Sequence, residues 1–371
     1  MQTVWRAVGM GACFLVMLAA CAAPEIVPTR AAIIFTPAIT PSPSTATPTA
    51  TATRTPTFTP IATLTRTPTR AATPTSAPTP TLHADLLDVT IEGLRARAYP
   101  GGQIRVTHTI TVTDAYTRTY ITFPSDGLTI SGLMHVPFGA GPFPVVVMNH
   151  GYIPPAQYVT GSDTYRAADI LARNGYITIS PDFRGYARSD DGLNLFRAGY
   201  MIDALNAAAS VKSLPYADAS RIGMWGHSMG GGVVARAMTV SALIKAYVLY
   251  APVSADVRVR RFAGGLSGAD RAEEAELHDS YAYWSSKAEL IDAVSPINYF
   301  QYVTAPAQIH IGQIDTTTPP ERSRAIRDEL NKQGKYVEYY EYPRQAHAFI
   351  GGGWTLFNQR VVAFFDKYLK R

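Results

Sequence analysis

Residues 221–232 read RIGMWGHSMGGG, and this stretch decides the fold. An apolar run of strand character leads into a glycine-rich turn, and residues 229–240 then have the composition of a helix. The turn contains the pattern G-x-S-x-G, with Ser228 between Gly226 and Gly230. In such a strand–turn–helix setting a serine hydroxyl projects above the sheet as a nucleophile, and glycines fit the sharp turn without a side-chain collision. The stretch therefore predicts a nucleophilic Ser228; a turn that only happens to contain serine is the alternative.

Apolar strands and amphipathic helices alternate on both sides of this stretch. The alternation predicts a mostly parallel sheet with helices on both faces, because buried parallel strands are apolar over their whole length. The predicted strands are residues 143–149, 176–181, 221–226, 246–251, 307–312 and 336–342. The predicted helices lie near residues 162–174, 197–213, 229–240, 320–333 and 354–370. The expected fold class is α/β, with a doubly wound sheet.

Two further segments are expected to flank this sheet. Upstream, four runs with the two-residue period of strands predict an antiparallel N-terminal lead-in. These runs are residues 86–94, 103–113, 117–125 and 128–137. Downstream, residues 254–296 form an insertion rich in charged and aromatic residues, which predicts a small helical lid over the ends of the strands. Its aromatic residues Tyr281, Tyr283 and Trp284 suit an apolar acyl group, although packing is the commoner role of such side chains.

A nucleophilic serine needs a general base, and in folds of this kind the chain order is serine, acid, histidine. Only His278, His310 and His347 follow Ser228. His310 lies inside a predicted strand, where packing is the expected role, and His278 lies in the predicted lid. His347 falls in the loop after the last strand and before the last helix. We therefore predict His347 as the base.

The acid of such a site is expected after the penultimate strand. Asp315 lies three residues past the strand 307–312. A carboxylate there would accept the N–H of His347, select its tautomer and stabilise the imidazolium. We predict Asp315 as the acid, with Asp256 as the second candidate and a turn-capping aspartate as the other interpretation.

The oxyanion of an acyl-transfer reaction needs two N–H donors. Met229, at the start of the predicted helix, supplies the first. The turn His150-Gly151-Tyr152 follows the first apolar strand, and Gly151 permits a close backbone approach. We predict the backbone N–H of Tyr152 as the second donor.

These motifs occur in order over residues 125–371, as SDGLTISGLMHVP, VVVMNHGY, ISPDFRGYARSDDG, RIGMWGHSMGGG and YPRQAHAF. The set resembles the alpha/beta-hydrolase superfamily, and within it the catalytic domain of the prolyl oligopeptidase family, which includes acylaminoacyl peptidases, and related dienelactone-hydrolase-like esterases. The resemblance implies a catalytic triad of Ser228, Asp315 and His347, with Tyr152 and Met229 in the oxyanion hole.

Peptidases of this family usually carry a large β-propeller that admits only peptides, and residues 83–124 are too few for one. We therefore expect a serine hydrolase that cleaves carboxylic ester or short acyl bonds through an acyl-enzyme intermediate. A serine-type exopeptidase or oligopeptidase is the alternative, and a non-catalytic surface binding module is a remote one. The expected partner is a small-molecule or short-peptide acyl substrate.

The N-terminal residues predict export and anchoring. Residues 1–20 contain a short apolar run typical of a signal peptide and end in LAA before Cys21, which resembles the lipobox of bacterial lipoproteins. An ordinary signal peptide is the alternative. Residues 21–82 are rich in Thr and Pro and predict a disordered tether lipidated at Cys21. Residues 83–371 would then be a catalytic domain outside the cytoplasm, anchored to the cell membrane.

Charge and cysteine content exclude several other functions. The net charge is +5, but residues 1–82 hold five arginines and one glutamate, so the positive balance belongs mostly to the tether. No basic face for nucleic acid is therefore expected. Cys13 would leave with the signal peptide and Cys21 would carry the lipid, so neither a disulfide nor a zinc site is predicted. No metal or cofactor is expected.

Overall fold

The computed structural model describes residues 84–262 and 288–370. Cys21, the predicted signal peptide and the whole predicted tether lie outside the described residues, as does the middle of the predicted lid, 263–287. In the described part of the chain, no helix is both long and apolar enough to cross a membrane.

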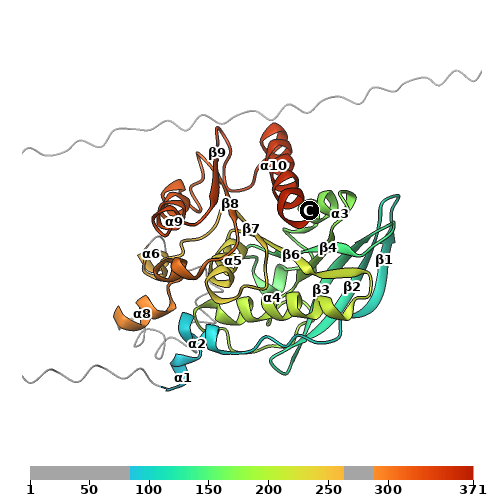
Figure 1. Cartoon of the computed structure of the whole chain (residues 1–371), viewed down its shortest axis with the longest axis horizontal. Helices are drawn as coiled ribbons and strands as arrows, with labels where there is room; N and C mark the ends of the chain where they lie inside the picture. Colours follow the sequence, from blue (N-terminus) through green and yellow to red (C-terminus); the bar gives the residue numbers. More distant parts are fainter. Residues whose placement is uncertain (1–83, 263–287, 371) are drawn as a thin grey trace, which may run out of the picture. The chain divides into compact units, whose positions relative to one another are not determined.

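A nine-stranded sheet forms the centre of the described residues (Figure 1). Its order is β1-β2-β3-β5-β4-β6-β7-β8-β9. Strands β1, β2, β3 and β5 pair antiparallel, and every pair from β5 and β4 to β8 and β9 is parallel. The strands are β1 Arg105–Val112, β2 Tyr116–Ser125, β3 Leu128–Pro137, β4 Phe143–Asn149, β5 Ile177–Pro181, β6 Ala217–His227, β7 Ala246–Tyr250, β8 Ala307–Gly312 and β9 Val337–Tyr342. The predicted mostly parallel sheet with an antiparallel lead-in is confirmed.

Helices cover both faces of this sheet. Side chains on β4 alternate between two hydrophobic clusters: Val145 and Val147 belong to one, Val146 and Met148 to the other. The first cluster includes α4 and α5, and the second includes α3 and α10, so these helix pairs lie on opposite faces. The helices are α1 Ala84–Leu87, α2 Ile91–Ala96, α3 Tyr165–Arg173, α4 Ala198–Ser210, α5 Met229–Val240, α6 Val257–Phe262, α8 Ala288–Val294, α9 Pro320–Lys332 and α10 Gly351–Leu369. The sheet is therefore doubly wound, as predicted.

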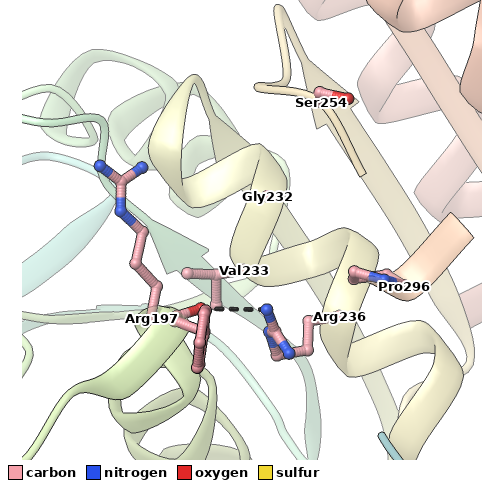
Figure 2. Close-up of a pocket in the computed structure, with 7 residues that line it drawn as sticks. Arg197, Gly232, Val233, Arg236, Ser254 and Pro296 are labelled. Carbon is pink, nitrogen blue, oxygen red and sulfur yellow. Dashed lines mark hydrogen bonds between the residues drawn. The ribbon is translucent and has the colours of Figure 1, made fainter. Parts of the chain in front are cut away.

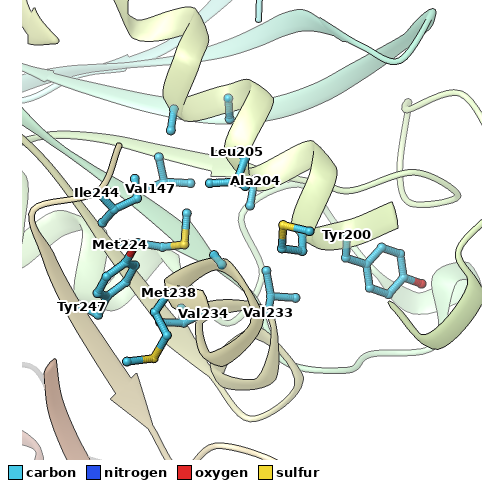
Figure 3. Packing of buried hydrophobic residues seen from close by; sticks show 14 of the residues in the cluster. Val147, Tyr200, Ala204, Leu205, Met224, Val233, Val234, Met238, Ile244 and Tyr247 are labelled. Atoms are coloured by element: carbon cyan, nitrogen blue, oxygen red, sulfur yellow. The ribbon is translucent and has the colours of Figure 1, made fainter. Parts of the chain in front are cut away.

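Helix α5 lies deep in the first cluster. Val234 and Met238 pack near Met224 of β6 and Leu205 of α4 (Figure 3). Eleven of the twelve residues of α5 are buried, and Arg236 and Thr239 are the polar side chains among them. Because nearly the whole helix lies in the interior, its N-terminus is held in place by packing.

The prediction for residues 86–94 is wrong: this run forms no strand but contributes to α1 and α2. Thr90 caps α2, and its hydroxyl accepts a hydrogen bond from the Gly93 N–H at 3.0 Å. Ile91 and Leu94 are both fully buried, and their three-residue spacing places them on one face of a helix. The hydrogen-bonded cap and the buried face stabilise a helix here, and they outweigh the two-residue alternation of the sequence that predicted a strand.

The described ends of the predicted lid are helical. Helices α6 and α8 pack against each other through Val257, Leu290 and Val294. Residues 263–287 lie outside the described part, and so do Tyr281, Tyr283 and Trp284. The role of this insertion as a lid stays a prediction.

Candidate active site

Ser228 lies in the sharp turn between strand β6 and helix α5. Its backbone has φ 54° and ψ −113°, and such a conformation costs a non-glycine residue about 1–3 kcal/mol. The Ser228 N–H donates to the Tyr250 carbonyl at 2.9 Å, and the Val253 N–H donates to the Ser228 carbonyl at 3.1 Å. These bonds to β7 and to the chain after it hold the strained turn in place, which is the geometry of a nucleophile elbow.

The glycines beside Ser228 leave no room for a side chain. A Cβ atom at Gly226 would lie 2.2 Å from the Gly230 carbonyl oxygen, and one at Gly230 would lie 2.0 Å from the Asn149 carbonyl oxygen. The obstructing atoms belong to the backbone, which cannot move aside as the end of a flexible side chain can. The close contact of α5 with the ends of β6 and β4 therefore requires both glycines.

Asp315 and His347 lie together at the carboxyl ends of β8 and β9. His347 Nδ1 donates to Asp315 Oδ2 at 2.8 Å. The same carboxylate accepts the backbone N–H groups of Thr317 and Thr318 and the Thr318 hydroxyl at 2.8–2.9 Å. Because Nδ1 carries the proton shared with Asp315, the lone pair of His347 is left on Nε2, where a general base needs it.

The charge of Asp315 is stabilised by these partners. Burial alone would raise the pKa of Asp315, but the hydrogen bonds from His347 and Thr318 hold it below its ordinary value. Asp256, the other candidate acid, instead accepts bonds from the backbone and guanidinium of Arg258. Asp315, and not Asp256, is thus the carboxylate beside His347.

His347 packs against His227, the residue that precedes Ser228. The rings of His227 and His347 lie 4.8 Å apart between centroids and are tilted by 36°. No hydrogen bond joins the Ser228 hydroxyl to His347 among the described residues; in sites without substrate such bonds are often long. The ring contact therefore places His347 beside the residue that precedes Ser228.

The turn after β4 lies close to Ser228. A Cβ atom at Gly151 would lie 3.2 Å from Ser228 Cβ, a tight contact that glycine avoids. The Gly151 N–H is already used, since it donates to Asp163 Oδ2 at 2.6 Å. Tyr152 is the next residue of this turn, and Met229 opens α5, whose first N–H groups have no partner within the helix. Both predicted donors thus belong to segments that border Ser228.

Two residues of this region were missed by the sequence analysis. His227 Nδ1 lies 2.9 Å from both carboxylate oxygens of Asp163, and His227 Nε2 lies 3.2 Å from the His347 carbonyl oxygen. The only signal for His227 was its place inside G-x-S-x-G, and Asp163 had no motif around it. His310, by contrast, is buried in β8 and bonds to Tyr342 and Gln308, as its predicted packing role requires.

A small pocket lies beside α5 (Figure 2). Gly232, in its lining, lies one helical turn from Ser228, and the Gly232 N–H donates to the Ser228 carbonyl at 3.2 Å. Arg236 Nη2 donates to the Phe196 carbonyl at 3.0 Å. The lining residues are Phe196, Arg197, Gly232, Val233, Arg236, Ser254 and Pro296.

Metal ligands do not gather anywhere in residues 84–262 and 288–370: no group of three or more His, Cys, Asp or Glu side chains could hold an ion there.

Solved structures with this fold include esterases and peptidases. Acetyl xylan esterase 1 from Thermoanaerobacterium sp. JW/SL YS485 is 16% identical, with a TM-score of 0.57, over 76% of this chain and 92% of the esterase. The acetyl xylan esterase from Paenibacillus sp. R4 is 19% identical, with a TM-score of 0.57, over 75% of this chain and 92% of the esterase. The acylaminoacyl peptidase of Pyrococcus horikoshii is 22% identical, with a TM-score of 0.55, over 70% of this chain but only 42% of the peptidase. These similarities confirm the α/β-hydrolase fold.

The family is given by the sequence itself. The model of the prolyl oligopeptidase family matches residues 163–371, which is more than half of the chain and contains Ser228, Asp315 and His347. With its strained serine between β6 and α5 and its buried carboxylate–histidine pair, the chain belongs to the prolyl oligopeptidase family and is a serine hydrolase that acts on ester or peptide bonds.

Proposed function

We propose that Ser228, His347 and Asp315 form a catalytic triad that hydrolyses carboxylic esters. The observation that carries the proposal is the His347–Asp315 hydrogen bond of 2.8 Å beside the strained Ser228 turn. A base whose Nδ1 is held by a buried carboxylate keeps its Nε2 lone pair directed away from that carboxylate, where it can accept a proton from the nucleophile.

In the proposed mechanism, Ser228 Oγ attacks the ester carbonyl carbon while His347 Nε2 takes the hydroxyl proton. The N–H groups of Met229 and Tyr152 stabilise the oxyanion of the tetrahedral intermediate. The C–O bond to the alcohol then breaks, and His347 returns the proton to the leaving oxygen. Water repeats the sequence on the acyl-enzyme and releases the carboxylic acid and the free serine.

Ester hydrolysis is favoured over peptide hydrolysis by the extent of the similarities. The chain covers 92% of two acetyl xylan esterases but only 36–42% of the similar peptidases. The peptidases therefore contain a large additional part with no counterpart in this match. Residues 84–124 form only α1, α2, β1 and most of β2.

A comparison of p-nitrophenyl butyrate with aminoacyl-p-nitroanilides tests this preference. We expect kcat/KM to be larger for the ester, because the similarity spans nearly the whole of the two esterases but less than half of the peptidases. Rapid cleavage of the anilides with negligible cleavage of the ester would instead favour the second candidate, a serine-type exopeptidase or oligopeptidase.

We also propose that the chain is a lipoprotein held outside the cytoplasm by a lipid on Cys21. The support is the apolar run of residues 1–20, which ends in LAA before that cysteine, and the Thr/Pro-rich residues that follow. Incorporation of labelled palmitate into the wild type but not into Cys21→Ser is expected. Equal labelling of both chains would contradict the anchor.

The Asp315→Asn variant is expected to lower kcat/KM by about 10³–10⁴-fold. An amide can donate a hydrogen bond to His347 Nδ1 and would then select the wrong tautomer, leaving a proton on Nε2. The measurement is initial-rate kinetics on p-nitrophenyl butyrate. Asp256→Asn is the matched control and should stay near the wild type; a larger loss in the control than in Asp315→Asn would contradict the assignment of the acid.

A further inference from the structure

A second carboxylate–histidine pair lies beside the proposed triad. His227 immediately precedes Ser228, and its ring faces Asp163 on one side and the His347 carbonyl on the other. Asp163 has φ 68°, a conformation in which aspartate is enriched, and its carboxylate meets both His227 and the Gly151 N–H. The pair therefore links three segments: the turn after β4, the turn before α5 and the loop before α10.

The partners of His227 determine its protonation. A backbone carbonyl can only accept a hydrogen bond, so His227 Nε2 must donate to the His347 carbonyl at 3.2 Å. An ionised carboxylate can also only accept, so His227 Nδ1 must donate to Asp163 at 2.9 Å. Both nitrogens carry a proton only in the imidazolium form, so both hydrogen bonds form together only when His227 is positively charged.

The electrostatics of the two side chains agree with this geometry. Burial alone would raise the pKa of Asp163, but the charge and hydrogen bond of His227 and the Gly151 N–H lower it to about 2. Burial alone would lower the pKa of His227, but Asp163 and the His347 carbonyl raise it above its ordinary value. His310 shows the opposite case: its partners are a hydroxyl and an amide oxygen, and burial lowers its pKa.

We propose that His227 and Asp163 are a charged positioning pair that holds the oxyanion turn and the base loop against Ser228. Asp163 accepts the Gly151 N–H at 2.6 Å, which holds the turn that carries Tyr152. His227 fixes the His347 carbonyl, which limits the movement of the base relative to the nucleophile. This role rests on the proposed function of Ser228, His347 and Asp315, and neither member of the pair touches the reacting atoms.

The pair gives the reaction an alkaline limit. The titratable and charged groups around it are Asp163, Asp315, His347, Tyr250 and, beside Asp163, His150. Burial raises the pKa of Tyr250, so that ring stays neutral at ordinary pH. A histidine with a raised pKa keeps both bonds below that pKa and loses one of them as the pH rises through it. The kcat/KM of the wild type should therefore fall on the alkaline side as His227 loses its proton.

The test compares His227→Gln and Asp163→Asn with the wild-type full chain over a range of pH. We expect kcat to fall by about 10- to 100-fold in each variant with little change in KM, because a displaced catalytic group affects the transition state most. The alkaline limb should disappear in His227→Gln. It should move to lower pH in Asp163→Asn, because the anion that raises the pKa of His227 is gone. If the pair served folding alone, the alkaline limb of the pH profile would stay at its wild-type position in both variants.

His310→Gln is the matched control, since it also replaces a buried histidine with two bonded ring nitrogens. The folded fraction of His310→Gln should show the alkaline limb of the pH profile at its wild-type position. Where His227→Gln fails to fold, nitrogen NMR of wild-type His227 at neutral pH should show protons on both ring nitrogens. A neutral His227 would overturn the positioning pair alone. So would wild-type kcat and pH profile in His227→Gln and Asp163→Asn while Ser228→Ala and Asp315→Asn are inactive. Full activity in Ser228→Ala would overturn the proposed function itself.

Discussion

Replacement of Ser228 by alanine is expected to lower kcat by about 10⁵–10⁶-fold, which is the largest change in activity that a single substitution should cause here. In the strained turn, the Ser228 hydroxyl is the only group that can form an acyl-enzyme. Without this hydroxyl, His347 could act only through a water molecule that lies at the position of the hydroxyl. The loss should be nearly complete in kcat, whereas substrate binding should change little. The measurement is hydrolysis of p-nitrophenyl butyrate together with labelling by a fluorophosphonate probe.

The matched control is Ser241→Ala, at the other end of the same helix. Ser241 accepts a hydrogen bond from the Leu243 N–H and has no contact with the turn of Ser228. This control should be labelled by the probe and should hydrolyse the ester as the wild type does. Labelling of Ser228→Ala at the wild-type rate would show that another residue is the nucleophile.

Gly230→Ala is expected to destabilise the protein by about 3 kcal/mol, at the upper end of overpacking in a dense interior. The new methyl group would lie 2.0 Å from the Asn149 carbonyl oxygen and 2.8 Å from the His150 carbonyl oxygen. Helix α5 cannot retreat easily, because nearly all of its residues are packed in the core. The end of β4 and the turn that it carries must shift instead, so any folded fraction should also lose activity.

Gly352→Ala is the control for this substitution. Nothing lies within 4 Å of a Cβ atom at Gly352, which is in the first turn of α10. Alanine there should leave stability unchanged or raise it by about 0.4–1 kcal/mol, because it restricts the unfolded chain. Urea unfolding followed by circular dichroism measures both variants. Equal midpoints for the two would contradict the contact of α5 with β4.

Strongly patterned segments could be predicted from the sequence to the residue. Strands β3, β4 and β8 and helix α5 begin and end at the predicted positions. Their apolar runs are long and bounded by turn residues, so tertiary contacts act with the local pattern rather than against it. The run 86–94 was mistaken for a strand because its short alternation also fits a helix with buried residues three apart.

The sequence also indicated which residues to bring together at the site. Chain order and the positions of the loops led to Asp315 and His347, and these side chains do lie 2.8 Å apart. The two donors of the oxyanion hole were placed in turns that border Ser228. Their catalytic roles stay predictions that the kinetic variants above will test.

By itself, the sequence determined the α/β architecture, the glycine-flanked turn of Ser228 and the order of the chemical groups along the chain. Each of these depends on local pattern or on the sequence of elements, which neighbouring residues specify. Only the tertiary structure decided that Asp163 meets His227, because 64 residues separate them in sequence and Asp163 reaches its partner through a rare positive φ. It also brought two acceptors to the His227 ring, on which the proposed charge of His227 rests, since protonation depends on the atoms that surround a ring and not on the residues beside it in the chain.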